Sequence, residues 1–343
     1  MDRVYAALSR VPVFKNVRRE AVWIEPLGSL TNSTFKVMTH NEAYALRLPG
    51  KDTSDYIDRT AEEHNARAAT AVGVNTDIVY FNARNGTMLS RFVEGSAMTV
   101  EQFLLDPSAT VRVARALRKV HRLCPVFQTR FDVFEMLGKY RRILRKAPMP
   151  VSRDRAVWRG AEGIQRAFEA SPASLAPCHN DPWPGNFVDA GGRLYLIDWE
   201  FSGMNDPMWD LADLSVEAEL DPEQDRILME AYHEGPVPEV LYSRLALHKV
   251  MSDLLWSFWA FIQVANDNPR DDFPSYALGR FEKCEARMSS PDFQKDLNAV
   301  RGSQRPEISP HTHQNSPERR IPVIRESHQD DRRFVNVPSL KGP

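Results

Sequence analysis

A short loop-like segment, residues 178–186, constrains the fold of this chain more than any other feature. It reads Cys-His-Asn-Asp-Pro-Trp-Pro-Gly-Asn and places Asp181 and Asn186 in the spacing His-x-Asp-x-x-x-x-Asn. A short, mostly apolar strand is expected at 193–197, and it ends directly before Asp198. One loop with this spacing can present a carboxylate to an acceptor hydroxyl and an amide oxygen to magnesium. The segment indicates phosphoryl transfer, and it requires a scaffold that holds a loop rich in proline and glycine.

Each of these residues alone would mean little, because Asp and Asn are common in turns. Their coincidence favours chemistry, since phosphoryl transfer needs a base, metal-binding oxygens, a cation for the phosphates and a backbone cradle. We interpret Asp181 as the base, and Asn186 and Asp198 as magnesium ligands. His179 is interpreted as structural, because an imidazole beside the base more often holds the loop through backbone hydrogen bonds.

The first part of the chain predicts a small antiparallel sheet with one helix. Hydrophobic alternation and turn residues give the order β-β-β-α-β-β. Gly73 is a natural helix stop, and Asn85-Gly86 separates the last two strands. We place the end of this lobe near Gly95. The strands are expected at 23–27, 34–38, 43–48, 78–81 and 87–93, and the helix at 54–72.

Beyond Gly95 the sequence becomes mostly helical. A chain of 343 residues exceeds one comfortable core, so two lobes are expected, 1–95 and 96–290. The predicted fold class is α+β. Residues 291–343 are polar and show no periodic apolar face, which predicts a disordered tail. Helices are expected at 100–105, 109–123, 131–145, 153–170 and from 208 to about 288.

The loop between the first two predicted strands is a candidate cradle for the phosphates of ATP. Backbone amides and short hydroxyls at this place can cover phosphates. Arg47 on a nearby strand is placed to clamp the phosphates, the alternative being a surface arginine. Its expected ion-pair partner is Glu62 or Glu63, and the sequence leaves this choice open. The candidate loop residues are Gly28, Ser29, Thr31 and Asn32.

Two tryptophans, Trp256 and Trp259, stand three apart in a predicted helix and therefore lie on one face. Paired indole faces hold an ammonium group well through cation–π attraction. Aromatic residues at helical spacing are usually core residues. Beside a segment that indicates phosphoryl transfer, however, the pair favours a small amino-alcohol as the acceptor.

Composition and charge argue against several classes of protein. Apolar residues make up 42% and charged residues 26%, as in ordinary globular chains, and the net charge of −2 gives no reason to expect nucleic acid as a partner. The longest apolar stretch, 254–264, is too short to span a bilayer. The N-terminus lacks a secretory signal, and three cysteines without paired spacing fit reduced thiols, so a cytoplasmic protein is expected. The sequence does not reveal an oligomeric state.

Several motifs together resemble the choline/ethanolamine kinases, which share the fold of the aminoglycoside phosphotransferases and, more distantly, of the protein kinases. The resemblance runs from about Trp23 to Met288. The twin-tryptophan helix is its most specific part, because the catalytic segment is common to the whole superfamily. The motifs are Gly-x-x-Thr-Asn at 28–32, Leu-Arg-Leu at 46–48, Glu-x-x-Asn at 62–65, the segment 178–186, Ile-Asp-Trp-Glu at 197–200, Trp-x-x-Trp-x-x-Ile-Gln at 256–263 and Tyr-Ala-x-x-Arg-Phe at 276–281.

The resemblance implies a two-lobed, protein-kinase-like fold and a kinase that uses ATP and Mg²⁺ to phosphorylate choline or ethanolamine. It implies that Asp181 is the base and that Asn186 and Asp198 bind magnesium. Glu200 would be a nearby acidic group that assists the metals.

The resemblance also implies an acceptor site in which Trp256, Trp259 and Tyr276 surround the ammonium group. Asp210 and Asp213 lie three apart at a helix start, so one would brace the catalytic loop and the other would face the cation. We favour Asp213 for the cation.

Two alternatives stay open. The same fold could carry an aminoglycoside, amino-sugar or thiamine kinase, and acidity around Asp213, Glu217 and Glu219 would favour that acceptor class. The other alternative is a non-catalytic, kinase-like nucleotide-binding protein, against which the complete set of base and metal ligands argues.

Overall fold

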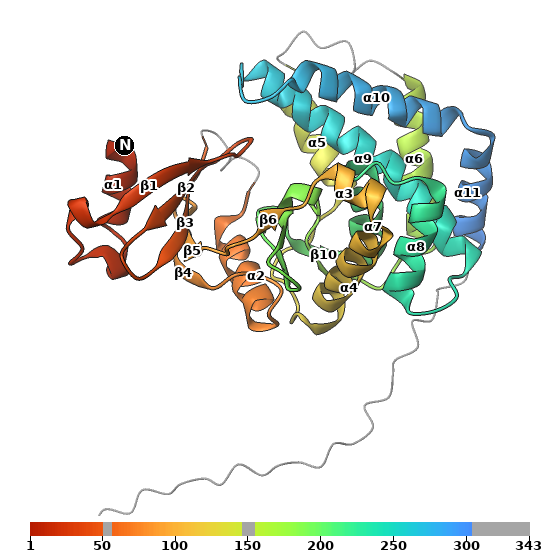
Figure 1. Ribbon diagram of the computed structural model, residues 1–343. Helices are drawn as coiled ribbons and strands as arrows, with labels where there is room; N and C mark the ends of the chain where they lie inside the picture. Colours follow the sequence, from red (N-terminus) through yellow and green to blue (C-terminus); the bar gives the residue numbers. More distant parts are fainter. Residues whose placement is uncertain (51–56, 146–154, 304–343) are drawn as a thin grey trace, which may run out of the picture. The chain divides into compact units, whose positions relative to one another are not determined.

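The computed structural model describes residues 1–50, 57–145 and 155–303 of the chain. Its first lobe is built on a five-stranded antiparallel sheet in the order β1-β2-β3-β5-β4 (Figure 1). This arrangement confirms the predicted α+β fold class. The elements are β1 (Trp23–Leu27), β2 (Ser33–Met38), β3 (Ala43–Leu48), α2 (Arg59–Ala71), β4 (Ile78–Asn82) and β5 (Thr87–Arg91).

One face of this sheet is covered by a helix that the sequence did not predict. Val37, Leu46 and Leu89 are 0% exposed, and they pack with Val4 and Leu8 of helix α1 (Asp2–Leu8). Seven residues are too few for a convincing helical period, and so short a helix depends on tertiary packing. Two short 3-10 turns, η1 (Pro12–Phe14) and η2 (Arg19–Ala21), connect α1 to β1.

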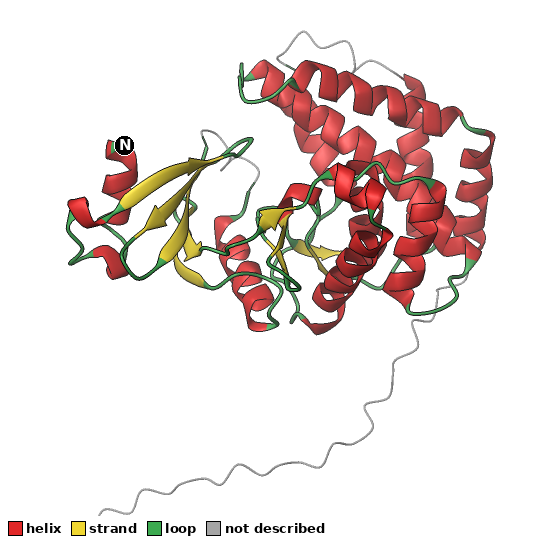
Figure 2. Ribbon diagram, viewed as in Figure 1, coloured by secondary structure: helices red, strands yellow, loops and turns green. Residues whose placement is uncertain are grey.

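The second lobe is mainly helical, as the red ribbons of Figure 2 show. Its first helices are α3 (Val100–Leu105), α4 (Pro107–Leu123), α5 (Val133–Leu144) and α6 (Arg155–Ala170). Its later helices are α7 (Pro207–Glu217), α8 (Pro222–His233), α9 (Glu239–Ala265), α10 (Phe273–Ser289) and α11 (Pro291–Gly302).

Five short strands flank the two loops that carry the candidate residues Asp181, Asn186 and Asp198. β7 pairs with β10, and β8 pairs with β6 and β9. The loop 179–186, which we call the catalytic loop, runs from β7 to β8 and contains the turn η5 (Pro184–Asn186), whereas the loop 197–202 runs from β9 to β10. Both ends of each loop are therefore fixed by hydrogen-bonded strands. The strands are β6 (Ser96–Ala97), β7 (Ala176–Cys178), β8 (Phe187–Asp189), β9 (Leu194–Leu196) and β10 (Gly203–Asn205).

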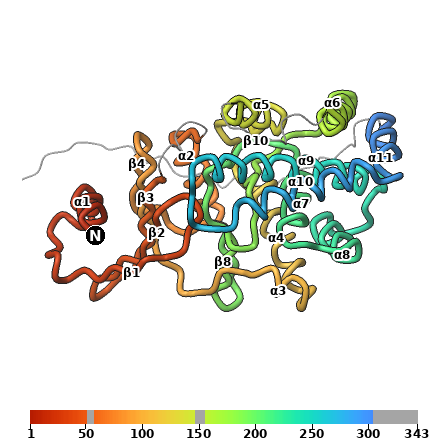
Figure 3. Tube along the Cα trace, turned by 90° about the horizontal axis from the view of Figure 1, so that it is seen from above, coloured from red at the N-terminus to blue at the C-terminus, as the bar shows by residue number. Residues whose placement is uncertain are grey.

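Helix α9 is the centre of the second lobe. It packs against α5, α7, α10 and α11, and α9 and α10 run side by side in Figures 1 and 3. Leu254 and Leu255 are 0% exposed, as expected for a helix that is apolar on nearly all sides. This burial fixes the orientation of the tryptophans that α9 carries.

A buried ionic cluster joins α7 to α9. Asp206 caps the first turn of α7 by accepting a hydrogen bond from the Met208 N–H at 3.0 Å. Its other carboxylate oxygen accepts from Arg244 and from His248, the latter at 2.8 Å. Burial alone would raise the pKa of Asp206, yet His248 and Arg244 hold that pKa below its usual range. The carboxylate is therefore charged and satisfied inside the lobe.

We expect Asp206→Ala to lower the free energy of unfolding by about 3 kcal/mol, because it removes a cap and leaves the Arg244 guanidinium buried without its carboxylate. The carboxylate has a depressed pKa, so its stabilisation is present above the ordinary value of 3.8 and is lost at lower pH. Urea unfolding at pH 7 and pH 3 measures the effect. Asp221→Ala, at the exposed cap of α8, is the control and should cost about 1 kcal/mol. Equal losses in the two variants would contradict the role of the buried cluster.

The structure moves the boundaries of two elements in the first lobe. Helix α2 begins at Arg59, not at residue 54, because Asp58 caps it by accepting from the N–H groups of Thr60 and Ala61. Residues 51–56 lie outside the described residues. Strand β5 ends at Arg91 instead of residue 93.

The predicted tail also begins too early. Residues 291–302 form helix α11, whose Leu297 and Val300 are buried where it packs on α6 and α9. Two widely spaced apolar residues give a weak sequence signal, and only the partner helices make them a core face. The remainder of the predicted tail, 304–343, lies outside the described residues, as do residues 146–154.

Within the described ranges, no helix combines the length and apolarity that crossing a membrane requires. Cys124, Cys178 and Cys284 are buried and carry free thiols.

Candidate active site

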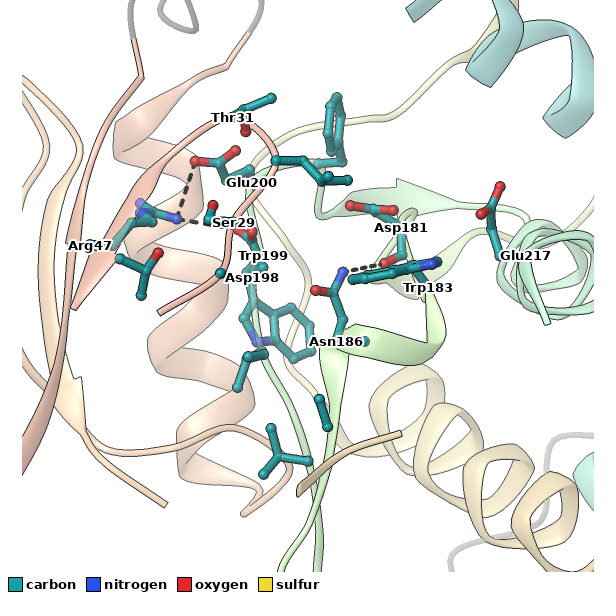
Figure 4. A pocket seen from close by; sticks show the side chains of 18 of the residues that line it. Ser29, Thr31, Arg47, Asp181, Trp183, Asn186, Asp198, Trp199, Glu200 and Glu217 are labelled. Atoms are coloured by element: carbon teal, nitrogen blue, oxygen red, sulfur yellow. Dashed lines mark hydrogen bonds and ion pairs between the residues drawn. The ribbon is translucent and has the colours of Figure 1, made fainter. Parts of the chain in front are cut away.

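A cavity of about 920 Å³ lies where the sheet of the first lobe faces the second lobe. In the close view of Figure 4, Asp198 and Asn186 lie between Arg47 on one side and Asp181 on the other. Most of the residues that the sequence proposed are thus brought together from both lobes. Those that line the cavity are Gly28, Ser29, Thr31, Arg47, Glu62, Asp181, Asn186, Asp198, Glu200, Trp256, Trp259 and Tyr276.

Asp210, in the first turn of α7, braces the catalytic loop. Its two carboxylate oxygens accept hydrogen bonds from the backbone N–H groups of His179 and Asn180, each at 2.8 Å. Asn180 has a φ of 68°, a left-handed conformation that needs such support. His121 of α4 contacts the same carboxylate through Nε2 at 2.9 Å. The bracing role expected for one of the two α7 aspartates therefore falls to Asp210.

His179 joins the two functional loops to each other. Its Nε2 donates to the carbonyl oxygen of Ile197 at 2.9 Å, and its ring packs edge-on against Trp199. Ile197 directly precedes Asp198, so the imidazole links the catalytic loop to the segment that carries Asp198, one of the two metal-ligand candidates.

Asn186 and Asp198 offer the kind of oxygens that Mg²⁺ prefers. The amide Nδ2 of Asn186 donates to the carbonyl oxygen of Asp181 at 2.9 Å, which leaves Oδ1 as the atom available to a cation. Burial and the neighbouring Glu200 raise the pKa of Asp198 to about 7. An amide oxygen and a carboxylate are hard ligands, and a divalent cation would offset the crowding of negative charge. The residues present fit magnesium.

Asp181 belongs to the same group of crowded carboxylates (Figure 4). Burial raises the pKa of Asp181 well above its usual range, and the negative charges of Asp213, Asp198 and Glu217 raise it further. Cations bound nearby would lower this pKa and allow the carboxylate to ionise. The electrostatics of the cavity therefore suit cationic ligands.

Two buried arginines, Arg47 and Arg59, form ion pairs with three carboxylates beside the cavity. Nη1 of Arg47 lies 2.5 Å from Glu62, 3.2 Å from Glu200 and 3.3 Å from Asp198. Nη1 of Arg59 lies 2.7 Å from Glu62 and 2.6 Å from Glu200. Burial by itself lowers the pKa of Arg47, but Glu62, Glu200 and Asp198 raise it overall. Arg47 is therefore a fixed positive charge at the wall of the cavity.

This cluster identifies the partner of Arg47. Glu62 faces inward to both arginines, whereas Glu63 pairs with Arg67, also on α2 and partly exposed. Arg59 was not a sequence candidate. Arg59 lies three residues before Glu62 on α2. The sequence could not reveal its role, because it does not show which face of α2 packs against the loop that carries Glu200.

The loop 28–32, which we call the phosphate loop, connects β1 to β2 above the cavity. Its last residue, Asn32, was expected to contact ATP, but it is 1% exposed and does not line the cavity. Its Nδ2 donates to Glu200 at 3.0 Å, and its Oδ1 accepts from the Gly50 N–H at 3.2 Å. The structure corrects the prediction: the Asn32 side chain ties the loop to the second lobe.

Aromatic side chains from the second lobe also line the cavity. The rings of Trp256 and Trp259 meet edge to face, with centroids 5.9 Å apart. Phe201 packs in the same manner on Trp256, with a centroid distance of 5.5 Å. Tyr276 of α10 completes the wall and donates its hydroxyl to Glu217 at 2.8 Å. A wall of this kind offers ring faces and edges to a small ligand.

The expectation that Asp213 faces a cation is wrong in this structure. Asp213 is 0% exposed and does not line the cavity. Its Oδ1 accepts from the Trp256 indole N–H at 2.5 Å and from the Ser252 hydroxyl at 2.6 Å. The sequence determines the spacing between Asp210 and Asp213 but not the direction in which the Asp213 side chain points. In the structure this carboxylate does not reach the cavity; it binds the indole N–H of Trp256 and orients that ring.

Glu217, one turn further along α7, is the carboxylate of this helix that reaches the cavity. Burial raises the pKa of Glu217, although Arg280 and Tyr276 oppose the shift. Arg280 lies 2.9 Å from the same oxygen that accepts from Tyr276. Glu217 lies four residues after Asp213 and therefore on the same face of the helix, so its position could have suggested it as a site residue. For Phe201 the sequence offered a weaker indication, namely that this residue directly follows Glu200.

The sequence and the fold match known proteins over most of the chain. Residues 23–248 match the model of the phosphotransferase enzyme family. A crystal structure of a choline/ethanolamine kinase family protein from Mesorhizobium loti is 40% identical, with a TM-score of 0.76, over 88% of this chain and 98% of that one. Protein LicA of Haemophilus influenzae is 27% identical over 79% of this chain and 81% of its own length. The structure of choline kinase LicA from Streptococcus pneumoniae, 24% identical, shares the fold with a TM-score of 0.73 over 84% and 99% of the two chains.

These matches and the assembled site define a phosphotransferase with a protein-kinase-like fold, an ATP-dependent kinase of small molecules. Within that class, the chain belongs to the choline/ethanolamine kinase family.

If Asp181 is the base, Asp181→Asn should lower kcat at least a hundredfold, because general-base catalysis contributes about 10²- to 10⁴-fold. The dissociation constant of ATP should change little, since Asn186 and Asp198 lie between Asp181 and Arg47, the residue expected to hold the phosphates, in Figure 4. Steady-state kinetics and calorimetry measure the two quantities. Asp189→Asn on β8, whose carboxylate pairs with Arg112 and does not line the cavity, is the control. An Asp181→Asn enzyme that keeps a substantial share of kcat would exclude this assignment.

Proposed function

We propose that this protein phosphorylates the hydroxyl group of choline, or less readily that of ethanolamine, with ATP and Mg²⁺. The observation that carries the proposal is a single cavity that is lined both by Asp181 and by the aromatic side chains of Trp256, Trp259 and Tyr276. An amino-alcohol has a hydroxyl two carbons away from its ammonium group. Such a molecule can place the hydroxyl at a carboxylate while its ammonium rests against Trp256, Trp259 and Tyr276.

The residues suggest a reaction in which the protein mainly positions charge. Asp181 would orient the acceptor hydroxyl and accept its proton as the new bond to phosphorus forms. Arg47 would hold the phosphates, and the backbone of the phosphate loop would cover them. Magnesium, when bound by Asn186 and Asp198, would supply neutralisation of the phosphate charge.

The wall favours a quaternary ammonium over a primary one. A trimethylammonium group donates no hydrogen bonds, so aromatic faces and a nearby negative charge satisfy it. A primary ammonium needs acceptors for three N–H groups. Glu217 is the buried carboxylate at this wall, and one of its oxygens already accepts from Tyr276 and pairs with Arg280. Choline is therefore the favoured acceptor.

The same pairs weigh against a polycationic acceptor such as an aminoglycoside. Binding of a ligand with several ammonium groups would require several unpaired carboxylates where the acceptor binds. Glu219 also lines the cavity, but it pairs with Lys283 at 3.1 Å, as Glu217 does with Arg280. Arg280 and Lys283 therefore partly neutralise the negative charge of Glu217 and Glu219.

A panel of acceptors tests the proposal. Magnesium-dependent ATP consumption is measured with choline, ethanolamine, thiamine and kanamycin, and we expect the highest kcat/KM with choline. Trp259→Leu should raise the KM for choline about 30-fold, because a desolvated cation–π contact contributes about 2 kcal/mol. Trp259 is the preferred position, since Trp256 is more deeply buried and a variant there risks the fold.

Trp23→Leu is the matched control, because Trp23 is an exposed tryptophan on β1 that does not line the cavity. Activity on thiamine or kanamycin alone would reject the proposed acceptor. An unchanged KM for choline in Trp259→Leu would reject the aromatic site while leaving the kinase reaction intact.

The metal ligands make a separate prediction. Asn186→Ala should raise the Mg²⁺ concentration for half-maximal activity at least tenfold, since loss of a group that supports a metal commonly costs 10- to 100-fold in affinity. Asn298→Ala, on the exposed side of α11, should leave it unchanged. The assay is a Mg²⁺ titration at saturating ATP and choline, after treatment with EDTA. Overlapping titration curves for Asn186→Ala and the wild type would remove Asn186 from the metal site.

A further inference from the structure

The loop between α9 and α10 is hydrogen-bonded to the phosphate loop, 28–32, across more than two hundred residues of sequence. We call residues 266–272 the strap. Nη1 of Arg270 donates to the carbonyl oxygens of Ser29, at 2.9 Å, and of Asn32. Asn268 Nδ2 donates to the carbonyl oxygen of Leu30 at 3.1 Å. Figure 3 shows the turn from α9 to α10 lying beside the turn from β1 to β2.

The strap is itself anchored to the helix that carries the aromatic wall. Asn268 Nδ2 also donates to the side chain of Gln263 at 3.0 Å, and the Asn268 N–H donates to the Gln263 carbonyl at 3.1 Å. Gln263 is 5% exposed and lies one turn after Trp259. The Arg270 N–H in turn donates to the Asn268 side chain at 3.2 Å. The contacts therefore run from a buried part of α9 to the tip of the phosphate loop.

The backbone of the phosphate loop forms hydrogen bonds to the strap through its carbonyl oxygens. Three of its carbonyl oxygens, those of Ser29, Leu30 and Asn32, accept from the strap. Its backbone N–H groups at positions 29–32 donate to no acceptor among the described residues. A loop whose carbonyls are bound and whose amides are free presents partial positive charge, which is the arrangement that binds anionic phosphates.

Side-chain packing holds the loop in the same place. Leu30 packs against the hydrophobic cluster of the second lobe that contains Trp256. Arg270 Nη2 also donates to the Ser33 hydroxyl at 3.2 Å, at the first residue of β2. These contacts fix the loop along its whole length. Without them, the exposed glycine at position 28 would leave the backbone mobile.

We propose that Arg270 and Asn268 are positioning residues for the nucleotide: by binding the carbonyl side of the phosphate loop, they hold its amide side toward the phosphates of ATP. They act through the loop and not through contact with the acceptor. The proposal rests on the family reaction, ATP-dependent phosphoryl transfer, and not on the identity of the acceptor.

The test measures nucleotide binding without any acceptor. Calorimetry gives the dissociation constants of MgATP and of adenosine for the wild type, Arg270→Ala and Asn268→Ala. Because three charge-assisted hydrogen bonds are lost, Arg270→Ala should weaken MgATP at least about tenfold. Adenosine, which has no phosphates, should bind within about twofold of the wild type.

Asn268→Ala separates geometry from charge. Asn268 carries no charge, so a weakening of MgATP of about threefold in this variant would come from the loop and not from a lost positive field. The double variant should be less than additive, since both side chains hold one loop. Arg226→Ala is the matched control: Arg226 is a partly exposed arginine on α8 with two ion pairs and no contact with the cavity.

Three results would overturn the proposal. One is unchanged MgATP affinity in both strap variants. Another is equal weakening of adenosine and MgATP, which would indicate a general displacement of the lobes. The third is full MgATP affinity in Asn268→Ala with loss in Arg270→Ala alone, which would assign the effect to charge. Failure of the choline proposal would leave all these nucleotide measurements valid.

Discussion

The site depends first on the two hydrogen bonds that Asp210 accepts from the backbone of His179 and Asn180. Asn180 has the left-handed conformation that side chains other than glycine seldom adopt. A buried carboxylate that accepts from two successive N–H groups compensates for this conformation, and the β7–β10 and β8–β9 pairs fix the loop ends. Because the loop is held in this way, Asp181 and Asn186 lie at fixed positions on the cavity wall.

A second constraint is the excess of negative charge around the cavity. Asp181, Asp198 and Glu217 are crowded, and burial raises the pKa of each. A protein that bound only neutral ligands would gain nothing from this arrangement, since like charges inside a fold are unfavourable. Magnesium at one end and an ammonium group at the other would relieve it. Arg47 and Arg280 limit the excess without removing it.

Much of the architecture follows from local sequence. The sheet strands, helices α3 to α10 and the loop position of the catalytic residues agree with hydrophobic period and turn residues. The strands β6 to β10, with only two or three residues each, could not be predicted in full, because so few residues carry no period. Helices α1 and α11 were missed because their small apolar faces become meaningful only against a partner.

The sequence by itself determined the chemistry: which residues could serve as base, metal ligands and phosphate cation follows from residue type and spacing along one chain. Tertiary structure decided where side chains point. It chose Glu62 over Glu63, turned Asp213 behind Trp256 and brought Glu217 to the cavity instead. It also joined Arg270 to the phosphate loop. Spacing fixes neighbours along a helix, but the direction of a side chain depends on packing between elements that are distant in sequence, and that packing has no local signature.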